Sequence, residues 1–288
     1  MRIGLFVEDM GKTIEEYFAE VKAAEQAGIR AVWLGERLSW DPLTLLAMTS
    51  REVPDIALGA AVVRTYPHHP LALAAQALTV GNQLVLGLGP SHQPLIEGQY
   101  GYDYTKPVRH MREYLTALIP LLHGESVDYQ GETLKAHGQI TAPGSQPPPV
   151  LISALGPQML KLAAELTDGT ITVWAGPKTI GDYFVPTLQK AGKGIKVVAT
   201  VTVSVTDDPD AARESLNQTY APARDLPSYR RVLDREGVDN IGDTVIAGSE
   251  EQVAQELQRY RDAGATEIIA VTVGDHQRAI NLLGELTS

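Results

Sequence analysis

Short apolar segments alternate with helical segments along the whole chain, and this alternation restricts the folds that it can adopt. Strands that alternate with helices through short links form a parallel sheet. The apolar segments lie at 3–7, 31–35, 56–63, the first part of 83–92, 150–154, 170–174, 196–205 and 268–273. Eight such units favour closure into a (β/α)8 TIM barrel, and the 288 residues are close to the usual size of that α/β fold. The structural alternative is an open, doubly wound sheet.

Local signals mark where helices begin and end. Thr13-Ile14-Glu15-Glu16 has the spacing of a capping box, Ser249 begins another helix, and Gly28 and Gly264 each end one. Three segments interrupt the rhythm: the polar loop 93–105, the Gly-rich stretch 123–147, which predicts a hairpin, and the mostly helical stretch 207–246. We therefore expect one barrel domain over 1–288 with three insertions, and a helix within 177–191.

The chain is acidic and lacks cysteine. Its net charge is -11 and its pI about 5.1, which argues against non-specific binding to nucleic acid or to anionic membranes. The absence of cysteine excludes disulfides, thiol nucleophiles and Cys-based metal sites. No apolar run resembles a signal peptide or a membrane span. We expect a cytoplasmic protein that binds a small-molecule substrate, with no nucleic acid and no membrane as partner.

The stretch 83–92 predicts a buried strand that ends in a polar loop. Gly87 and Gly89 remove side chains where the strand ends, so another backbone or a ligand can approach closely. Ser91 and His92 then place a hydroxyl and an imidazole at that edge. In a barrel of parallel strands, the carboxyl ends of the strands carry the active site.

Several familiar motifs are absent. Gly87-x-Gly89 begins like a dinucleotide fingerprint, but His92 stands at the third position, and the glycines fall at the end of the apolar run. The chain has no P-loop, no His-Glu-x-x-His and no Gly-x-Ser-x-Gly elbow. His68 and His69 are adjacent in a loop and have no acidic partner at ligand spacing. We predict no metal site.

Polar or Gly-rich residues follow each predicted strand, and in a barrel these ends meet in one mouth. They are Glu8-Asp9, Glu36-Arg37, Arg64-Thr65-Tyr66, Ser91-His92, Ser153-Ala154-Leu155-Gly156, Trp174-Ala175-Gly176, Thr206 and Gly274-Asp275-His276. The segment 153–157 also sets a bare strand end against a helix N-terminus, where free N–H groups favour a phosphate. The segment 174–177 repeats the arrangement. Two ordinary turns are the alternative.

Several of these motifs together resemble the luciferase-like monooxygenase superfamily, in particular its coenzyme F420-dependent oxidoreductase branch. The matching residues are Gly87-Leu88-Gly89-Pro90-Ser91-His92 with Glu97, Gly101, Pro107 and Glu113-Tyr114-Leu115; Thr65-Tyr66-x-x-His69-Pro70; Ala163-Ala164-Glu165-x-x-Asp168-Gly169-Thr170; and Ala24-Glu25-x-x-Gly28 before Val32-Trp33. The similarity covers nearly the whole chain in order.

The resemblance implies a bacterial luciferase-like TIM barrel, commonly a homodimer, with a flavin-type cofactor in its mouth. The ring-contacting positions implied are Glu36, Ala60, Ala61, Val62, Gly87, Leu88 and Gly89. The phosphate positions implied are Ala154, Leu155, Gly156 and Pro157, with Trp174 and Gly176 nearby. The family also implies a non-prolyl cis peptide bond in the third strand, here Ala61-Val62.

The leading hypothesis is hydride transfer between coenzyme F420 and a small organic substrate. Glu36 or His92 would act as acid or base, and Arg64 or Arg37 would balance charge; the intrinsic pKa of His92 suits proton shuttling. Many family members have His where this chain has Arg37, and many have Gly-Gly-Arg where it has 81–83. The alternatives are an FMN-dependent monooxygenase that uses molecular oxygen, and a ligand-binding barrel without turnover.

Overall fold

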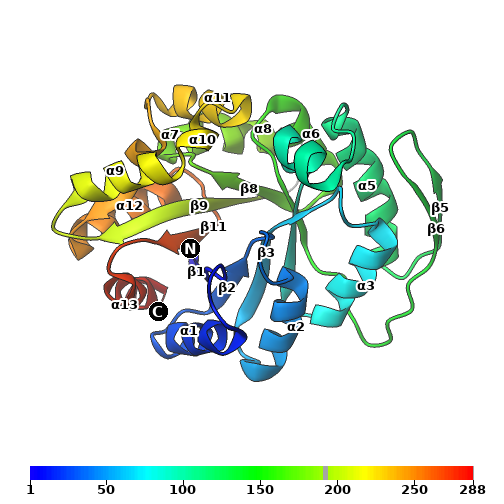
Figure 1. Ribbon diagram of the computed structural model, residues 1–288, viewed down its shortest axis with the longest axis horizontal. Coiled ribbons are helices and arrows are strands. Elements are labelled where there is room, and N and C mark those ends of the chain that lie inside the picture. The colour runs from blue at the N-terminus through cyan, green and yellow to red at the C-terminus, as the bar shows by residue number, and fades with distance from the viewer. Residues whose placement is uncertain (191–193, 288) are drawn as a thin grey trace.

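Eight parallel strands close into a barrel in the computed structural model, which describes residues 1–190 and 194–287 (Figure 1). In barrel order they are β1 (Arg2–Phe6), β2 (Ala31–Leu34), β3 (Ala57–Arg64), β4 (Leu84–Gly89), β7 (Val150–Ser153), β8 (Gly169–Val173), β9 (Lys196–Val205) and β11 (Glu267–Thr272). Pairing of β8 with β9 closes the ring. The predicted TIM barrel is confirmed, and the open sheet is wrong.

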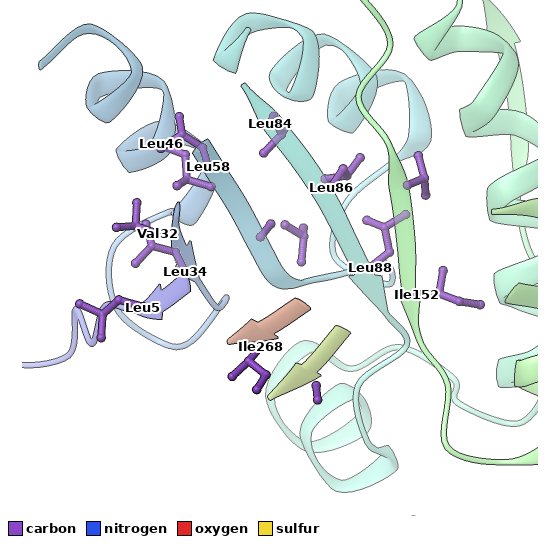
Figure 2. Close-up of a cluster of buried hydrophobic side chains, with 14 of the residues drawn as sticks. Leu5, Val32, Leu34, Leu46, Leu58, Leu84, Leu86, Leu88, Ile152 and Ile268 are labelled. Atoms are coloured by element: carbon purple, nitrogen blue, oxygen red, sulfur yellow. The ribbon is translucent and has the colours of Figure 1, made fainter. Parts of the chain in front are cut away.

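Helices cover the outside of the barrel, as Figure 1 shows. They are α1 (Ile14–Gln26), α2 (Pro42–Glu52), α3 (Pro70–Val80), α5 (Pro107–Leu122), α6 (Pro157–Leu166), α12 (Glu250–Asp262) and α13 (His276–Thr287). The capping boxes predicted at Thr13 and Ser249 are both formed. Leucine, valine and isoleucine side chains fill the layer between strands and helices, for example Leu58 beside Leu46 (Figure 2).

The helix expected within 177–191 is not continuous. The chain forms α7 (Pro177–Thr179), a π-helical segment (Ile180–Phe184) and α8 (Val185–Gln189). Pro186 has no N–H to donate to the carbonyl one turn earlier, so a regular α-helix cannot run unbroken through it. The predicted end at Ala191 lies outside the described residues.

The three predicted insertion segments differ in structure. The first holds α4 (Gln93–Leu95) and a π-helical turn (Ile96–Tyr100). The second forms the predicted antiparallel hairpin, β5 (Val127–Gln130) and β6 (Lys135–Gly138), beside α5 at the right of Figure 1. The third holds α9 (Pro209–Thr219), α10 (Ala221–Arg224), α11 (Pro227–Glu236), a 3-10 turn (Ile241–Thr244) and the start of β10 (Ile246–Gly248), which adds to β9 and was not predicted.

Side chains of neighbouring elements anchor the hairpin. The Glu113 carboxylate on α5 accepts hydrogen bonds from the backbone N–H groups of Glu132 and Thr133, at 3.1 and 2.7 Å. His69 Nε2 lies 2.8 Å from the carbonyl oxygen of Lys135 in β6, and its Nδ1 accepts from Leu71 N at the start of α3. Both ring nitrogens of His69 are thus engaged by backbone groups, so the pair His68-His69 is not arranged to bind a metal ion.

Trp33 closes the bottom of the barrel. Its ring lies where Gly4 and Gly59 have no side chain: a Cβ on Gly4 would be 2.7 Å from Trp33 Cδ1, and one on Gly59 would be 2.5 Å from Trp33 Cζ3. Trp33 Nε1 donates to the Glu267 carboxylate at 3.2 Å, and that carboxylate pairs with Arg2 at 2.5 Å. The open end of the barrel is therefore the carboxyl end. No helix among the described residues is long and apolar enough to cross a bilayer.

Gly59→Ala should destabilise the barrel, because its Cβ would overlap the Trp33 ring. We expect the free energy of unfolding, measured by urea denaturation, to fall by about 1–3 kcal/mol, as in other overpacked cores. Gly98→Ala is the matched control, since nothing lies within 4 Å of a Cβ there; it should change the same quantity by less than about 0.5 kcal/mol. Equal stability of the two variants would contradict the role assigned to Trp33.

Candidate active site

A cavity of ≈ 670 Å³ opens at the carboxyl end of the barrel. Every barrel strand contributes residues to its lining, from within the strand or directly after it: Phe6, Gly35, Glu36, Arg37, Ala61, Val62, Arg64, Gly89, Pro90, Ser91, His92, Ser153, Leu155, Gly156, Pro157, Thr172, Val173, Trp174, Thr200, Thr202 and Val271. The third insertion adds Tyr220, Ser228, Tyr229 and Arg231. The predicted convergence of polar strand ends in one mouth is confirmed for β2, β3, β4, β7 and β8, whereas Glu8-Asp9, Thr206 and 274–276 do not line the cavity.

The structure brings together most, but not all, of the predicted site residues. Those lining the cavity are Glu36, Ala61, Val62, Arg64, Gly89, His92, Leu155, Gly156, Pro157 and Trp174. Ala60, Gly87, Leu88, Ala154 and Gly176 are not part of the lining; Ala60, Leu88 and Ala154 are fully buried. Roles in cofactor binding stay predictions for the first group, and direct side-chain contact with a ligand in this cavity is not supported for the second.

Gly87 makes room for protein, not for a ligand ring as the sequence suggested. A Cβ at this position would overlap the carbonyl oxygen of Ala60 and lie 2.5 Å from Ile171 Cδ1. The register between β3 and β4 shifts between Ala60 and Val63, and the Ala61-Val62 peptide bond is cis, as the resemblance implied. Gly89 does line the cavity, beside Val62. The β3 irregularity therefore forms one wall.

Glu36 ties the end of β2 to the end of β3. Its Oε2 accepts a hydrogen bond from the backbone N–H of Arg64 at 2.7 Å and lies 3.2 Å from His68 Nε2. Its backbone N–H donates to the carbonyl of Val62 at 3.1 Å. These contacts make Glu36 a fixed acceptor at the cavity wall, and its predicted role as acid or base remains untested.

The arginines at the cavity differ in their surroundings. Arg37 forms an ion pair of 2.8 Å with Glu8 and lies over the Phe6 ring at 5.3 Å, so its charge is already balanced. Arg64 Nη1 lies 3.1 Å from the Tyr100 hydroxyl. Arg231 on α11 is exposed, and its side chain forms no hydrogen bond or ion pair with another described residue. Local cations thus line this cavity in a chain that is acidic as a whole.

The two predicted anion sites have different fates. At Gly156 the first turn of α6 receives no side-chain cap, and a Cβ there would meet nothing within 4 Å, so the helix N-terminus is open. At Gly176 the Glu236 carboxylate fills the space and accepts from Thr179 N at 2.8 Å. A carboxylate already occupies this second turn, so an anion site there is not supported.

Aromatic residues from the third insertion face His92, and the sequence did not single them out. His92 Nε2 lies 2.7 Å from the Tyr229 hydroxyl. Trp174, which has a left-handed φ of 53°, packs edge-on against Tyr229 and Tyr220 with ring centroids 4.5 and 5.2 Å away. Their only sequence signal was their place in the predicted insertion 207–246, because no motif links residues so far apart.

Two polar features of the cavity remain. Thr172 lines it, is fully buried, and its Oγ1 has no hydrogen-bond partner among the described residues, so a polar ligand atom would satisfy it. Thr200 and Thr202 add hydroxyls from β9. Among residues 1–190 and 194–287, no cluster of His, Asp or Glu has the arrangement to hold a metal ion.

A stack of aromatic rings supports the wall behind Tyr104, which lines the cavity. Tyr66 packs on Tyr104 with ring centroids 5.3 Å apart, and His110 stacks on Tyr66 at 3.9 Å. His110 Nε2 lies 3.0 Å from Thr65 Oγ1. Burial lowers the pKa of His110 to about 4, although the Glu113 carboxylate opposes the shift.

Known proteins share this fold and sequence pattern. The family described as luciferase-like monooxygenase matches residues 1–267. A 5,10-methylenetetrahydromethanopterin reductase of Archaeoglobus fulgidus is 30% identical over 99% of this chain and 98% of its own length. A putative coenzyme F420-dependent oxidoreductase of Mycobacterium tuberculosis is 27% identical over 98% of both chains. The structure of the coenzyme F420 dependent tetrahydromethanopterin reductase from Methanopyrus kandleri superposes with a TM-score of 0.83, at 22% identity, over 99% of this chain and 97% of that one.

The buried His110 should make stability fall on acidification. Its pKa is about 4 in the folded protein, against 6.5 for a histidine exposed to water, so between these values the unfolded state binds a proton that the folded state does not. The contribution of neutral His110 to the free energy of unfolding is fully present above pH 6.5. About 3 kcal/mol of that free energy is lost as the pH falls to 4. Urea denaturation at several pH values should show this loss in the wild type and a smaller one in His110→Gln. Parallel pH profiles for the two proteins would contradict it.

Proposed function

Because the chain belongs to the luciferase-like monooxygenase family, we propose that this enzyme transfers a hydride between the deazaflavin coenzyme F420 and a small organic substrate. The coenzyme F420-dependent relatives support the choice of cofactor. A ligand-binding barrel without turnover is not supported, since these relatives are a reductase and an oxidoreductase.

The shape and chemistry of the cavity are the observation that carries the proposal. One wall is bare backbone and small apolar side chains at Ala61, Val62 and Gly89, which suits a flat ring. Another wall is the uncapped N-terminus of α6 at Gly156, which suits a phosphate. A ligand with a flat ring and a phosphate, such as F420, fits this pair of surfaces.

The bound cofactor would supply the hydride chemistry, and the chain would orient it and manage protons. Ala61, Val62 and Gly89 would bind the ring. At Gly156 and Pro157, the backbone N–H groups that follow Pro157 in the first turn of α6 would bind the phosphate, since proline itself has no N–H. Glu36 would keep the β3 wall in place through Arg64 N. The burial of its ring and then the charge of Arg64 lower the pKa of His92, so the imidazole would be neutral near neutral pH. Its one ring N–H could then donate to the substrate.

We also propose that the whole chain acts as one domain and forms a homodimer in the cytoplasm, with the three insertions contacting the substrate. The third insertion supports the last point most directly, since Tyr220, Ser228, Tyr229 and Arg231 line the cavity. Analytical ultracentrifugation of the purified chain tests the dimer.

Cofactor titration separates the leading proposal from the FMN-dependent monooxygenase. We expect oxidised F420 to bind at micromolar or lower concentration, followed by quenching of its fluorescence, and FMN to bind at least tenfold more weakly. Reduced F420 should then lose its hydride to an acceptor from a panel of unsaturated and carbonyl compounds. Tight FMN binding without affinity for F420 would overturn the proposal in favour of the monooxygenase.

Gly156→Asp should weaken F420 binding and leave the fold intact. The new carboxylate would cap α6, which stabilises a helix by about 0.3 kcal/mol relative to glycine at the same position, and would repel a phosphate at the same N–H groups. We expect at least a tenfold rise in Kd, equivalent to about 1.4 kcal/mol. Gly156→Ala is the control: its Cβ meets nothing within 4 Å, so its Kd should stay within about threefold of the wild-type value. If Gly156→Asp bound F420 as tightly as the wild type, the phosphate would have to lie elsewhere.

A further inference from the structure

His92 and Tyr229 meet at the cavity although 137 positions separate them in the chain. The Tyr229 hydroxyl lies 2.7 Å from His92 Nε2, a short hydrogen bond. The two rings pack edge-on with centroids 5.0 Å apart. One side chain follows β4 and the other comes from the third insertion, so the contact exists only in the folded barrel.

The backbone next to His92 is fixed by its own contacts. The preceding residue, Ser91, has a left-handed φ of 63°. Its carbonyl oxygen accepts a hydrogen bond of 2.6 Å from the Tyr104 hydroxyl. Tyr104 in turn packs on Tyr66, so this loop is held from the side of α5.

Tyr229 is fixed by the anchoring of α11. At the far end of that helix, the Glu236 carboxylate accepts from Thr179 N at 2.8 Å. Arg230 donates to the carbonyl oxygens of Val238 and Asp239, at 2.8 and 2.7 Å. Trp174 packs edge-on against the Tyr229 ring itself. The hydroxyl of Tyr229 therefore has a defined position above His92.

The chemistry of the two groups decides which of them donates. The Tyr229 hydroxyl makes no hydrogen bond except the one to His92 within the described chain, so accepting from the imidazole would leave its own proton unpaired. A phenol O–H is also a stronger donor than a neutral imidazole N–H, and imidazole nitrogen is the stronger acceptor. A neutral imidazole has one donor and one acceptor nitrogen. If Nε2 accepts, the ring proton is on Nδ1.

We infer that Tyr229 is a positioning residue that donates to His92 Nε2 and thereby keeps the His92 proton on Nδ1. Nδ1 forms no hydrogen bond to any described residue, so its N–H is available to an oxygen or nitrogen atom of the substrate. That use of Nδ1–H rests on the proposed function, whereas the tautomer itself does not.

The tautomer can be measured without cofactor or substrate. Long-range proton–nitrogen NMR spectra of the full chain with nitrogen-15 histidine report which ring nitrogen carries the proton, and His92→Gln assigns the signals. In the wild type at neutral pH we expect Nε2 to resonate as an unprotonated and Nδ1 as a protonated nitrogen. In Tyr229→Phe the ratio of Nε2–H to Nδ1–H should rise about fivefold, the factor that corresponds to one ordinary hydrogen bond.

Tyr220→Phe is the matched control. Tyr220 packs on the same Trp174 ring but does not contact His92, so the His92 tautomer should match that of the wild type. A purely packing role for Tyr229 predicts that Tyr229→Phe, which keeps the ring, leaves the tautomer unchanged, and this result would overturn the inference. The inference would also be overturned if Nε2 of His92 carried the proton in the wild-type protein. This measurement does not depend on the folding of any variant.

The same samples distinguish this inference from the proposed function. A protein that binds no F420 but shows the Nδ1–H tautomer would refute the function and support the inference. A protein that binds F420 but carries the His92 proton on Nε2 would support the function and refute the inference.

Discussion

The carbonyl oxygen of Ala60 lies where any side chain on Gly87 would have to be, and the shape of the cavity depends on this close approach. With glycine at 87, β3 can shift its register against β4 between Ala60 and Val63 while the barrel remains closed. The displaced backbone of Ala61 and Val62 then forms a wall of the cavity. Gly87 therefore shapes the cavity indirectly, by leaving room for the backbone of the neighbouring strand β3.

Hydrogen bonds between successive strand ends hold that wall. Glu36 accepts from the backbone N–H of Arg64 and also lies within hydrogen-bond distance of His68, so a carboxylate from β2 fixes the geometry of β3. Because such a carboxylate is largely removed from water and already paired, its main effect is to orient backbone. His92 differs, since its Nδ1 has no hydrogen-bond partner among residues 1–190 and 194–287, and its Nε2 lies within hydrogen-bond distance of the Tyr229 hydroxyl. The part of the site that we propose to handle protons is therefore separate from the part that keeps its shape.

Local chemistry predicted the elements well. The alternation of apolar and helical segments, the capping boxes at Thr13 and Ser249 and the Gly-rich stretch before the hairpin depend on near neighbours in the chain, and the structure has all of them. Prediction failed where a distant group intervened. The turn at Gly176 has the same local pattern as that at Gly156, yet Glu236 occupies it from α11. Tyr229 gave no signal, because its meaning depends on His92 in a loop 137 positions earlier.

The sequence by itself determined the barrel, the strand ends that carry the site and the open N-terminus at Gly156, because periodicity, capping and glycine placement act over a few residues. Only the tertiary structure decided which of those strand ends face the cavity and which hydroxyl contacts the imidazole of His92. It also decided which of the two predicted anion sites is occupied by a carboxylate of the protein itself. These outcomes depend on side chains from separate insertions packing over one mouth, and no short-range pattern in the chain encodes that packing.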